Sequence, residues 1–166
     1  MYDNIAICNA PSKAFNLAGL HTSYIIIPNQ ELHDKYLEKM NIECLNFPSV
    51  FGYRSMIAAY TYGDAWIDAQ NQHLLNNYNY LKSYLTKELP KVVVTKLEGT
   101  YLVWLDFSYT KYSTNELLEK CSQGGITCSG GVNFGKDYES FLRFNIACSF
   151  EQLKQGLELL VKIFKY

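Results

Sequence analysis

The order of apolar and polar positions along the 166 residues predicts a mixed chain of strands and helices. Short apolar runs are typical of strands, and they occur at Asn4–Cys8, Ser23–Ile27, Val92–Lys96, Tyr101–Phe107 and Phe141–Ala147. Apolar residues at spacings of three and four predict helices over Asn29–Met40, Val50–Tyr62, Asp64–Leu89, Thr114–Cys121 and a last segment after Ser149. The Gly-rich stretch Ser129–Asp137 is predicted to be a loop.

The first two apolar runs predict buried strands that are joined by a functional loop. The intervening stretch Asn9–Thr22 holds Pro11 and Gly19 and has no long helical period. A parallel crossover normally needs a helix, so we expect the two strands to be antiparallel. Two strands alone cannot form a broad sheet with both faces covered. We therefore expect this part to belong to a larger domain whose beginning is missing from the chain.

The patterns predict three parts. Residues 1–63 hold two strands and helices, and residues 64–89 form one long linking helix, which Pro90 ends. Residues 90–166 form a small α/β domain. In its last helix, Ser149 and Gln152 have capping-box spacing, and the residues predicted to be buried are Leu153, Leu157, Leu160, Val161 and Phe164.

Composition and charge narrow the function classes. Hydrophobic residues make up 48% and charged residues 19%, which is typical of a globular protein. The net charge of -1 without a basic stripe argues against a nucleic-acid or anionic-membrane partner, and no segment reaches the apolar length of a membrane span. Five cysteines without a C-x-x-C pair and three scattered histidines argue against a metal site or a disulfide framework. Free thiols suit the cytoplasm, and each cysteine is expected to be a buried packing residue rather than a nucleophile.

Lys13 is the first candidate for chemistry. A lysine in a loop between strands is ordinarily a solvated surface charge. Here the flanking residues Ala10-Pro11 and Ala14-Phe15 are apolar. A lysine desolvated by such neighbours would have a lowered pKa, and the neutral amine is the form that Schiff-base chemistry needs.

Arg143 is the second candidate. In Phe141–Ala147 the alternation places Leu142, Phe144 and Ile146 on one face and Arg143 with Asn145 on the other. An arginine on an apolar strand needs a partner. Either it forms a structural ion pair, or its planar guanidinium binds a ligand carboxylate with two hydrogen bonds. Spacing alone favours the ion pair.

Three stretches in register resemble one family of enzymes. Ala10-Pro-Ser-Lys-Ala-Phe-Asn-Leu-Ala-Gly-Leu20 resembles the cofactor-lysine segment of fold-type I enzymes that depend on pyridoxal 5'-phosphate (PLP). Gly99–Phe107 is similar to the first small-domain hairpin of the class I/II aminotransferase relatives that include cystathionine β-lyases and C–S lyases. Phe141–Ala147 is similar to their carboxylate-binding strand, and Phe134-Gly135 fits the loop before it. The resemblance covers essentially the whole chain.

The resemblance implies roles for particular residues. Lys13 would carry PLP as a Schiff base and act as the catalytic residue, and Ser12 would lie near the cofactor phosphate. Arg143 would bind the α-carboxylate of an amino-acid substrate, and Asn145 would help to form that site. Tyr101 and Phe134 would line or support the site, although core packing is the more ordinary role for Tyr101.

The chain also departs from the family pattern. Many aminotransferases carry a second phosphate-binding arginine after the lysine, where this chain reads Leu20-His-Thr-Ser23, and this favours the lyase-like branch. Some relatives have a serine three positions before the lysine, where this chain has Ala10. The family's other cofactor-binding residues all precede the lysine, in sequence that this chain does not contain. We therefore expect a C-terminal piece, comprising the end of the PLP-binding large domain and the small domain, which is inactive and binds no PLP by itself.

The implied function of the parent enzyme is C–S β-lysis, in which a cysteine-derived amino acid yields a thiol, pyruvate and ammonia. Transamination is the alternative within the family, because it uses the same two residues. A different class of function is a non-catalytic fragment or packing module. The family further implies a homodimer, and apolar surface exposed in this chain would promote association.

Overall fold

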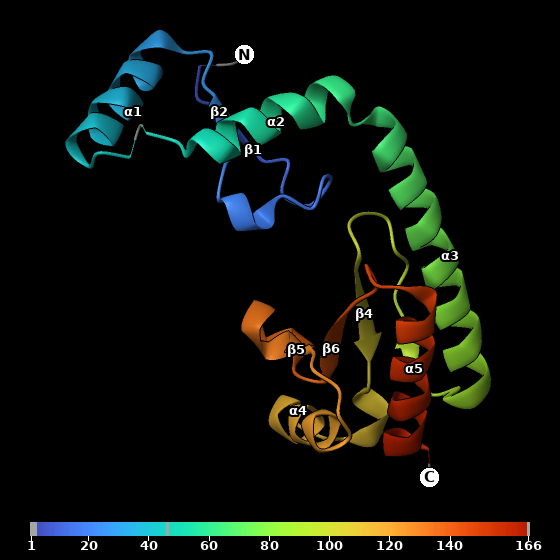
Figure 1. Ribbon diagram of the computed structural model, residues 1–166. Helices are drawn as coiled ribbons and strands as arrows, with labels where there is room; N and C mark the ends of the chain where they lie inside the picture. The colour runs from blue at the N-terminus through green and yellow to red at the C-terminus, as the bar shows by residue number, and fades with distance from the viewer. Residues whose placement is uncertain (1–2, 46, 166) are drawn as a thin grey trace. The chain divides into compact units, whose positions relative to one another are not determined.

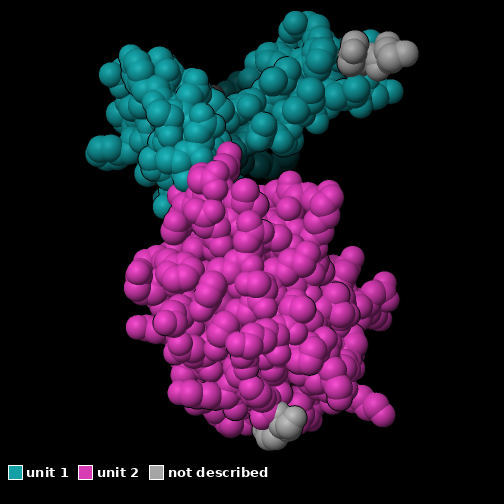
Figure 2. All heavy atoms as spheres, turned by 90° about the vertical axis from the view of Figure 1, so that its right-hand side faces the viewer, with its two compact units in different colours: residues 1–69 teal, residues 70–166 magenta. Residues whose placement is uncertain are grey.

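The structure is a computed structural model that describes residues 3–45 and 47–165, and it divides into two compact units (Figure 1). Unit 1 comprises residues 1–69 and unit 2 comprises residues 70–166, in teal and magenta in Figure 2. The boundary falls inside α3 (Asp64–Glu88), the helix predicted to link the parts. The assignment of residues 1–63, 64–89 and 90–166 to separate parts stays a prediction. No helix among the described residues is long and apolar enough to cross a membrane.

Unit 1 contains a two-stranded sheet and two helices besides the start of α3. β1 (Ile7–Asn9) pairs with β2 (Tyr24–Ile26), and the antiparallel direction confirms the prediction. A short 3-10 helix, η1 (Ala18–Leu20), lies in the loop between them. The helices α1 (Gln30–Ile42) and α2 (Val50–Tyr62) confirm the two predicted there.

The prediction that both N-terminal strands are buried is wrong for the part of the chain that the structure describes. Ile7 and Ile26 are 49% and 50% exposed. The only buried residues that the structure describes in unit 1 are Pro11 and Gly52. A two-stranded sheet has too little area to take its own side chains out of water, and the described residues of unit 1 do not cover both of its faces.

Unit 2 is built on a four-stranded antiparallel sheet in the order β3-β4-β6-β5. The strands are β3 (Val93–Val94), β4 (Leu102–Asp106), β5 (Ser129–Gly130) and β6 (Phe141–Asn145). Three of them confirm predicted strands with shorter bounds. β5 was predicted to be loop, because two residues with a glycine carry no alternating pattern, and only pairing with β6 defines it as a strand.

Three helices complete unit 2. α4 (Thr114–Gln123) contacts β5 and β6, while α3 and α5 (Phe150–Phe164) lie along one side of the sheet (Figure 1). All five residues predicted to be buried in the last helix are buried, and they join one core with Leu81, Leu85, Leu105 and Leu142. The predicted Gly-rich loop contains two 3-10 helices, η3 (Gly131–Phe134) and η4 (Lys136–Tyr138), and a third, η2 (Ser108–Thr110), follows β4.

Candidate cofactor and substrate sites

Lys13 lies in a tight turn that begins two residues after β1. The backbone N–H of Phe15 donates to the carbonyl oxygen of Pro11 at 2.9 Å, and that of Leu17 donates to Ser12 at 3.2 Å. Pro11 is fully buried beneath the turn, whereas the Lys13 side chain is exposed. The predicted desolvation of Lys13 is therefore wrong for unit 1 as the structure describes it, because Pro11 is the only one of the four flanking apolar residues that is buried.

The helix α2 fixes the position of this turn. Phe15 packs edge-on against Tyr60, with ring centroids 5.5 Å apart, and stacks on Trp66 at 6.2 Å. A Cβ atom on Gly63 would come within 2.5 Å of the Phe15 ring, and one on Gly52 would come within 1.8 Å of the Thr22 hydroxyl. Glycine at these two positions therefore allows the helix to approach the loop closely, and the aromatic contacts hold the lysine turn against it.

The hydroxyl of Ser12 is the neighbouring group that a cofactor phosphate would need. Ser12 is partly buried, and its side chain has no hydrogen-bond partner within residues 3–45 and 47–165. A hydroxyl can both donate and accept, and an accessible lysine amine stands next to it in the sequence. The chemistry of this turn therefore fits a carbonyl-bearing phosphate ester such as PLP, with the amine for the carbonyl and the hydroxyl for the phosphate.

Arg143 lies in the middle of β6, between two register partners. Trp104 of β4 is opposite it on one side and Ser129 of β5 on the other. Its guanidinium carbon lies 4.3 Å from the ring centroid of Phe134, and Nη2 reaches the Ser129 hydroxyl only at 3.5 Å. Phe134 therefore contacts the arginine through a cation–π interaction, while its predicted role in lining or supporting a substrate site stays a prediction. Sequence reasoning missed Ser129 and Trp104, because their pairing with Arg143 depends on strand register.

The guanidinium of Arg143 has no carboxylate partner among the residues that the structure describes. Its Nε atom is buried and makes no hydrogen bond there. An arginine that gives up water around one nitrogen normally recovers the energy from an anion or an acceptor. The ion-pair alternative raised by the sequence is therefore not realised within this part of the chain, and Arg143 retains its capacity to bind a carboxylate.

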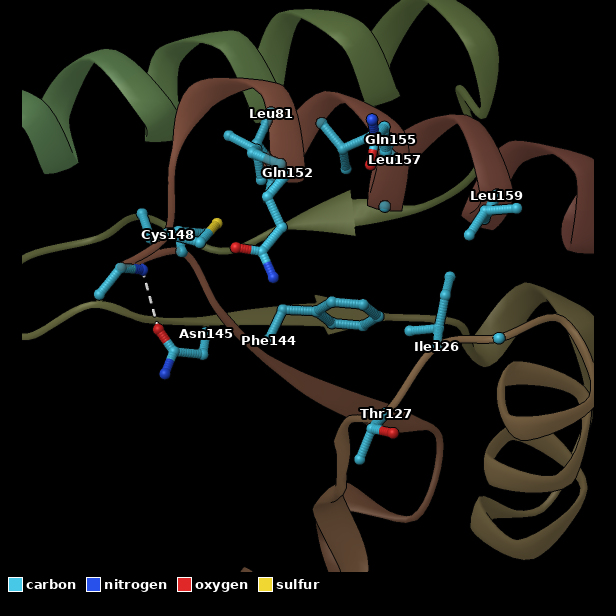
Figure 3. A pocket seen from close by; sticks show the side chains of 15 residues that line it. Leu81, Ile126, Thr127, Phe144, Asn145, Cys148, Gln152, Gln155, Leu157 and Leu159 are labelled. Carbon is cyan, nitrogen blue, oxygen red and sulfur yellow. Dashed lines mark hydrogen bonds between the residues drawn. The ribbon is translucent and has the colours of Figure 1, made fainter.

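Asn145 lies at the end of β6 and is exposed. Its side-chain oxygen accepts a hydrogen bond from the backbone N–H of Ala147 at 2.8 Å, the dashed line in Figure 3. The amide NH2 remains able to donate. Tyr101 packs against the core of unit 2, which is the more ordinary role that the sequence suggested for it.

A cavity of about 520 Å³ in unit 2 lies apart from Arg143. It opens between α5, the end of β6 and the turn at residues 125–127, and Figure 3 shows the Gln152 amide and the Phe144 ring within it. Asn145 is among its lining residues and Arg143 is not. Neighbouring residues of a strand point to opposite faces, so this cavity lies on the Phe144 side of the sheet. The structure therefore does not bring the two predicted substrate-binding residues together in one cavity.

These features define a class of protein, and the comparisons with known proteins agree. The chain belongs to the aminotransferase class I and II family, whose model matches residues 1–160. The branch within that family follows from the relatives. The chain is 36% identical over 151 residues to cystathionine beta-lyase PatB of Bacillus subtilis (strain 168). This alignment covers 90% of this chain and 39% of PatB. It is 30% identical to the protein MalY of Escherichia coli (strain K12), and this alignment covers 94% of this chain and 40% of MalY.

Two solved structures show the same fold. Cystalysin from Treponema denticola, which contains a PLP cofactor, superposes with a TM-score of 0.93 at 27% identity and covers 99% of this chain and 42% of its own. The PLP-bound C–S lyase from Staphylococcus hominis superposes with a TM-score of 0.87 at 34% identity, and the match covers 99% of this chain and 42% of the lyase. The predicted fold, that of fold-type I PLP enzymes, is confirmed. The chain spans about 40% of the length of the curated relatives it matches.

Proposed function

We propose that this chain supplies the cofactor lysine and the carboxylate-binding arginine of a PLP-dependent C–S β-lyase. Its substrate would be a cysteine-derived amino acid of the cystathionine type, and its products would be a thiol, pyruvate and ammonia. The observation that carries the proposal is Arg143, a half-buried guanidinium on a strand without a carboxylate partner among the described residues. The likeness to cystathionine β-lyase relatives supports the choice of reaction.

Lys13 would act twice in this reaction. Its amine would hold PLP covalently in the resting enzyme, and the amine released by substrate binding would take the proton from the substrate Cα as a general base. PLP, when bound, supplies the electron sink that makes this proton removable. The Lys13 side chain is exposed in its turn, on the side that a cofactor could reach, and Ser12 would donate its hydroxyl hydrogen to the cofactor phosphate.

Arg143 would contribute orientation rather than proton transfer. Two N–H groups of the guanidinium would bind the α-carboxylate in parallel, which fixes the rotation of the substrate about its Cα. The Phe134 ring holds the guanidinium from one side, so little side-chain entropy remains to be lost on binding. Asn145 follows Arg143 by two residues on β6, so both side chains project from one face of the strand, outside a shared cavity, and its amide would donate to the same carboxylate.

A chimera tests the proposal most directly. The segment of the Bacillus subtilis cystathionine β-lyase to which this chain aligns is replaced by residues 1–166, so that the rest of that enzyme accompanies the chain. We expect pyruvate and thiol release from L-cystathionine, and borohydride treatment should attach the cofactor to Lys13 in the tryptic map. Lys13→Ala should abolish both signals, whereas Lys111→Ala, a change at another lysine, should abolish neither.

Arg143→Lys in the same chimera tests the carboxylate anchor. Lysine keeps the charge and loses the paired hydrogen bonds, so KM for L-cystathionine should rise roughly tenfold or more, because about 1.5–3 kcal/mol is typical of a hydrogen bond to a charged group. A Lys13→Ala chimera that still releases pyruvate would overturn the role of Lys13. An Arg143→Lys chimera with unchanged KM would overturn the role of Arg143.

Transamination is the second candidate, since the family includes aminotransferases and the reaction uses the same two residues. It differs in the fate of the proton, which returns to the cofactor. Amino-group transfer to a keto acid without release of thiol would favour it over lysis. We further propose a cytoplasmic homodimer. The five free thiols support the location, and the exposed apolar side chains of unit 1 support association.

A further inference from the structure

Two of the five cysteines lie together at the junction of α4 and β5. Cys121 is in the last turns of α4, and Cys128 directly precedes β5. Between them the chain reverses at Gly124 and Gly125. Gly125 has a backbone φ of 83°, which residues with a side chain rarely adopt. The backbone N–H of Ile126 then donates to the carbonyl oxygen of Cys121 at 2.8 Å. This turn returns the chain along the end of the helix.

The turn brings the two thiols into direct contact. Cys128 packs against the buried cluster to which Cys121 belongs, and the two thiols interact through their side chains, which is the proximity that a disulfide between neighbouring elements requires. No sequence pattern predicts this pair, because six residues separate the two cysteines and they lack C-x-x-C spacing. The expectation that every cysteine is a buried packing residue is wrong, since only Cys121 is buried, whereas Cys8 and Cys44 are exposed.

The two thiols have different environments, and this difference sets the order of any reaction. Cys121 is fully buried and Cys128 is partly exposed. The hydrogen bond from the Cys121 thiol stabilises a thiolate on Cys128 and lowers its pKa, while the same hydrogen bond and burial raise the pKa of Cys121. The thiolate is the reactive form of cysteine, so Cys128 is the group that meets an oxidant first.

We propose that Cys121 and Cys128 form a reversible intrachain disulfide, with Cys128 as the attacking thiol and Cys121 as the resolving thiol. The oxidant is a small disulfide of the glutathione class. Cys128 loses its proton, attacks one sulfur of glutathione disulfide and expels one glutathione thiolate. Cys121 then loses its proton, attacks the Cys128 sulfur and expels the second. Two protein thiols are oxidised and one glutathione disulfide is reduced to two thiols, with both protons passing to the expelled thiolates.

The position of the pair links it to the arginine strand. Cys128 is followed by Ser129, the register partner of Arg143. Gly130 packs so closely on α4 that a Cβ atom there would lie 2.3 Å from the Thr114 methyl. The disulfide would therefore lock β5 to a helix that it already contacts, without requiring the sheet to open.

Tryptic digestion reads the disulfide directly, because both cysteines fall in the single peptide 121–136. The whole folded chain is equilibrated in glutathione redox buffers and then unfolded in urea with excess iodoacetamide before digestion, so that the buried Cys121 is alkylated as well. In reducing buffer this peptide should carry two alkyl groups. In oxidising buffer it should carry none and should weigh less than the unalkylated peptide by two hydrogens, about 2 Da. Peptide 144–154, which contains Cys148, is the internal control and should remain alkylated.

Single variants test the order of attack. Cys121→Ser should trap Cys128 as a mixed disulfide with glutathione, and Cys128→Ser should leave Cys121 reduced in the same buffer. Cys148→Ser should not change the pairing. The same oxidation in urea should spread the disulfides over all five cysteines and shows whether the fold selects the pair. The proposal is overturned if peptide 121–136 keeps both alkyl groups in oxidising buffer, or if Cys128 pairs with other cysteines as often in the folded chain as in urea. None of these readouts depends on PLP or on lyase activity.

Discussion

Units 1 and 2 use similar amounts of apolar sequence in opposite ways. In unit 2 the apolar side chains form one core, and Leu105 and Leu142 are fully buried. In unit 1 the helices and the hairpin are equally well formed, yet Phe47 and Phe51 are 81% and 77% exposed. Exposed apolar clusters of this kind mark surfaces that other protein covers. Local patterns are therefore sufficient to form helices and strands, whereas a buried core also needs further layers of structure packed against them.

The largest expected effect comes from removing matched apolar side chains in the two units. Leu142→Ala should destabilise unit 2 by about 2–5 kcal/mol, because it removes buried methyl groups and leaves a cavity. Ile26→Ala should cost unit 1 less than about 1 kcal/mol, because half of that side chain is already exposed. Urea unfolding is followed by Trp104 for the first variant and by Trp66 for the second, with the other tryptophan changed to Phe.

Equal losses of stability in Leu142→Ala and Ile26→Ala would contradict this difference between the two units. A large loss from Ile26→Ala would mean that the apolar side chains of unit 1 are buried in solution, as they would be in an association of chains. Repeating the measurement over a range of protein concentrations separates the two cases, since association makes the transition depend on concentration.

A buried polar anchor is a further feature that unit 2 has and that the described part of unit 1 lacks. Asn77 of α3 is 1% exposed, and its amide donates to the carbonyl oxygens of Ile146 at 2.9 Å and Cys148 at 3.1 Å. Asn77→Ala removes the donor to the buried Ile146 carbonyl, whereas the Cys148 carbonyl keeps its 2.8 Å hydrogen bond with His73, and the change should cost about 1–3 kcal/mol in urea unfolding. The neighbouring change Asn76→Ala, at an exposed position of the same helix, is the control and should stay within about 0.5 kcal/mol.

Sequence patterns predicted the elements of both units well and their burial in only one. The helix over Val50–Tyr62 has its predicted bounds, and the last helix buries its five predicted residues. The hairpin strands were also found, but their apolar composition does not reveal whether another layer is present. The motif singled out Lys13, whose role stays a prediction, but it did not indicate that the side chain is exposed or that Phe15 packs against Tyr60 of α2. Register partners such as Ser129, and the contact between Cys121 and Cys128, arise from turns and pairing that periodicity does not encode.

Helix capping offers a smaller and closely matched contrast. Ser113 begins α4 with a complete capping box, in which its hydroxyl accepts from the Glu116 N–H and the Glu116 carboxylate accepts from the Ser113 N–H. Ser49 occupies the same position before α2 and makes no capping hydrogen bond. Ser113→Ala should therefore cost about 1 kcal/mol, and Ser49→Ala close to nothing, in the same urea experiments. Equal losses would show that α2 is capped in solution in a way that the structure of unit 1 does not contain.

Ion pairs give the smallest contrast, and it fades in acid. In unit 1 the pairs Lys35–Glu31 and Lys39–Glu43 join neighbouring turns of one segment, whereas Lys165 pairs with Glu88 across α5 and α3 at 2.7 Å. The hydrogen bond from Lys165 lowers the pKa of Glu88 below its ordinary value of about 4.5. The unfolded chain then holds this proton more tightly, so the contribution is complete above pH 4.5 and is lost as pH falls through the folded pKa.

Lys165→Gln should therefore lower the urea midpoint of unit 2 at pH 6 slightly and should have a fading effect toward pH 3, whereas Lys39→Gln in unit 1 should leave that midpoint unchanged. The effect is small because both charges reach solvent, and added salt should reduce it further. A Lys165→Gln effect that persists at pH 3 would mean that packing of the lysine stem, rather than its charge, joins the ends of α3 and α5. In that case Lys165→Met should restore the stability that Lys165→Gln removes, because methionine keeps most of the apolar stem without the charge.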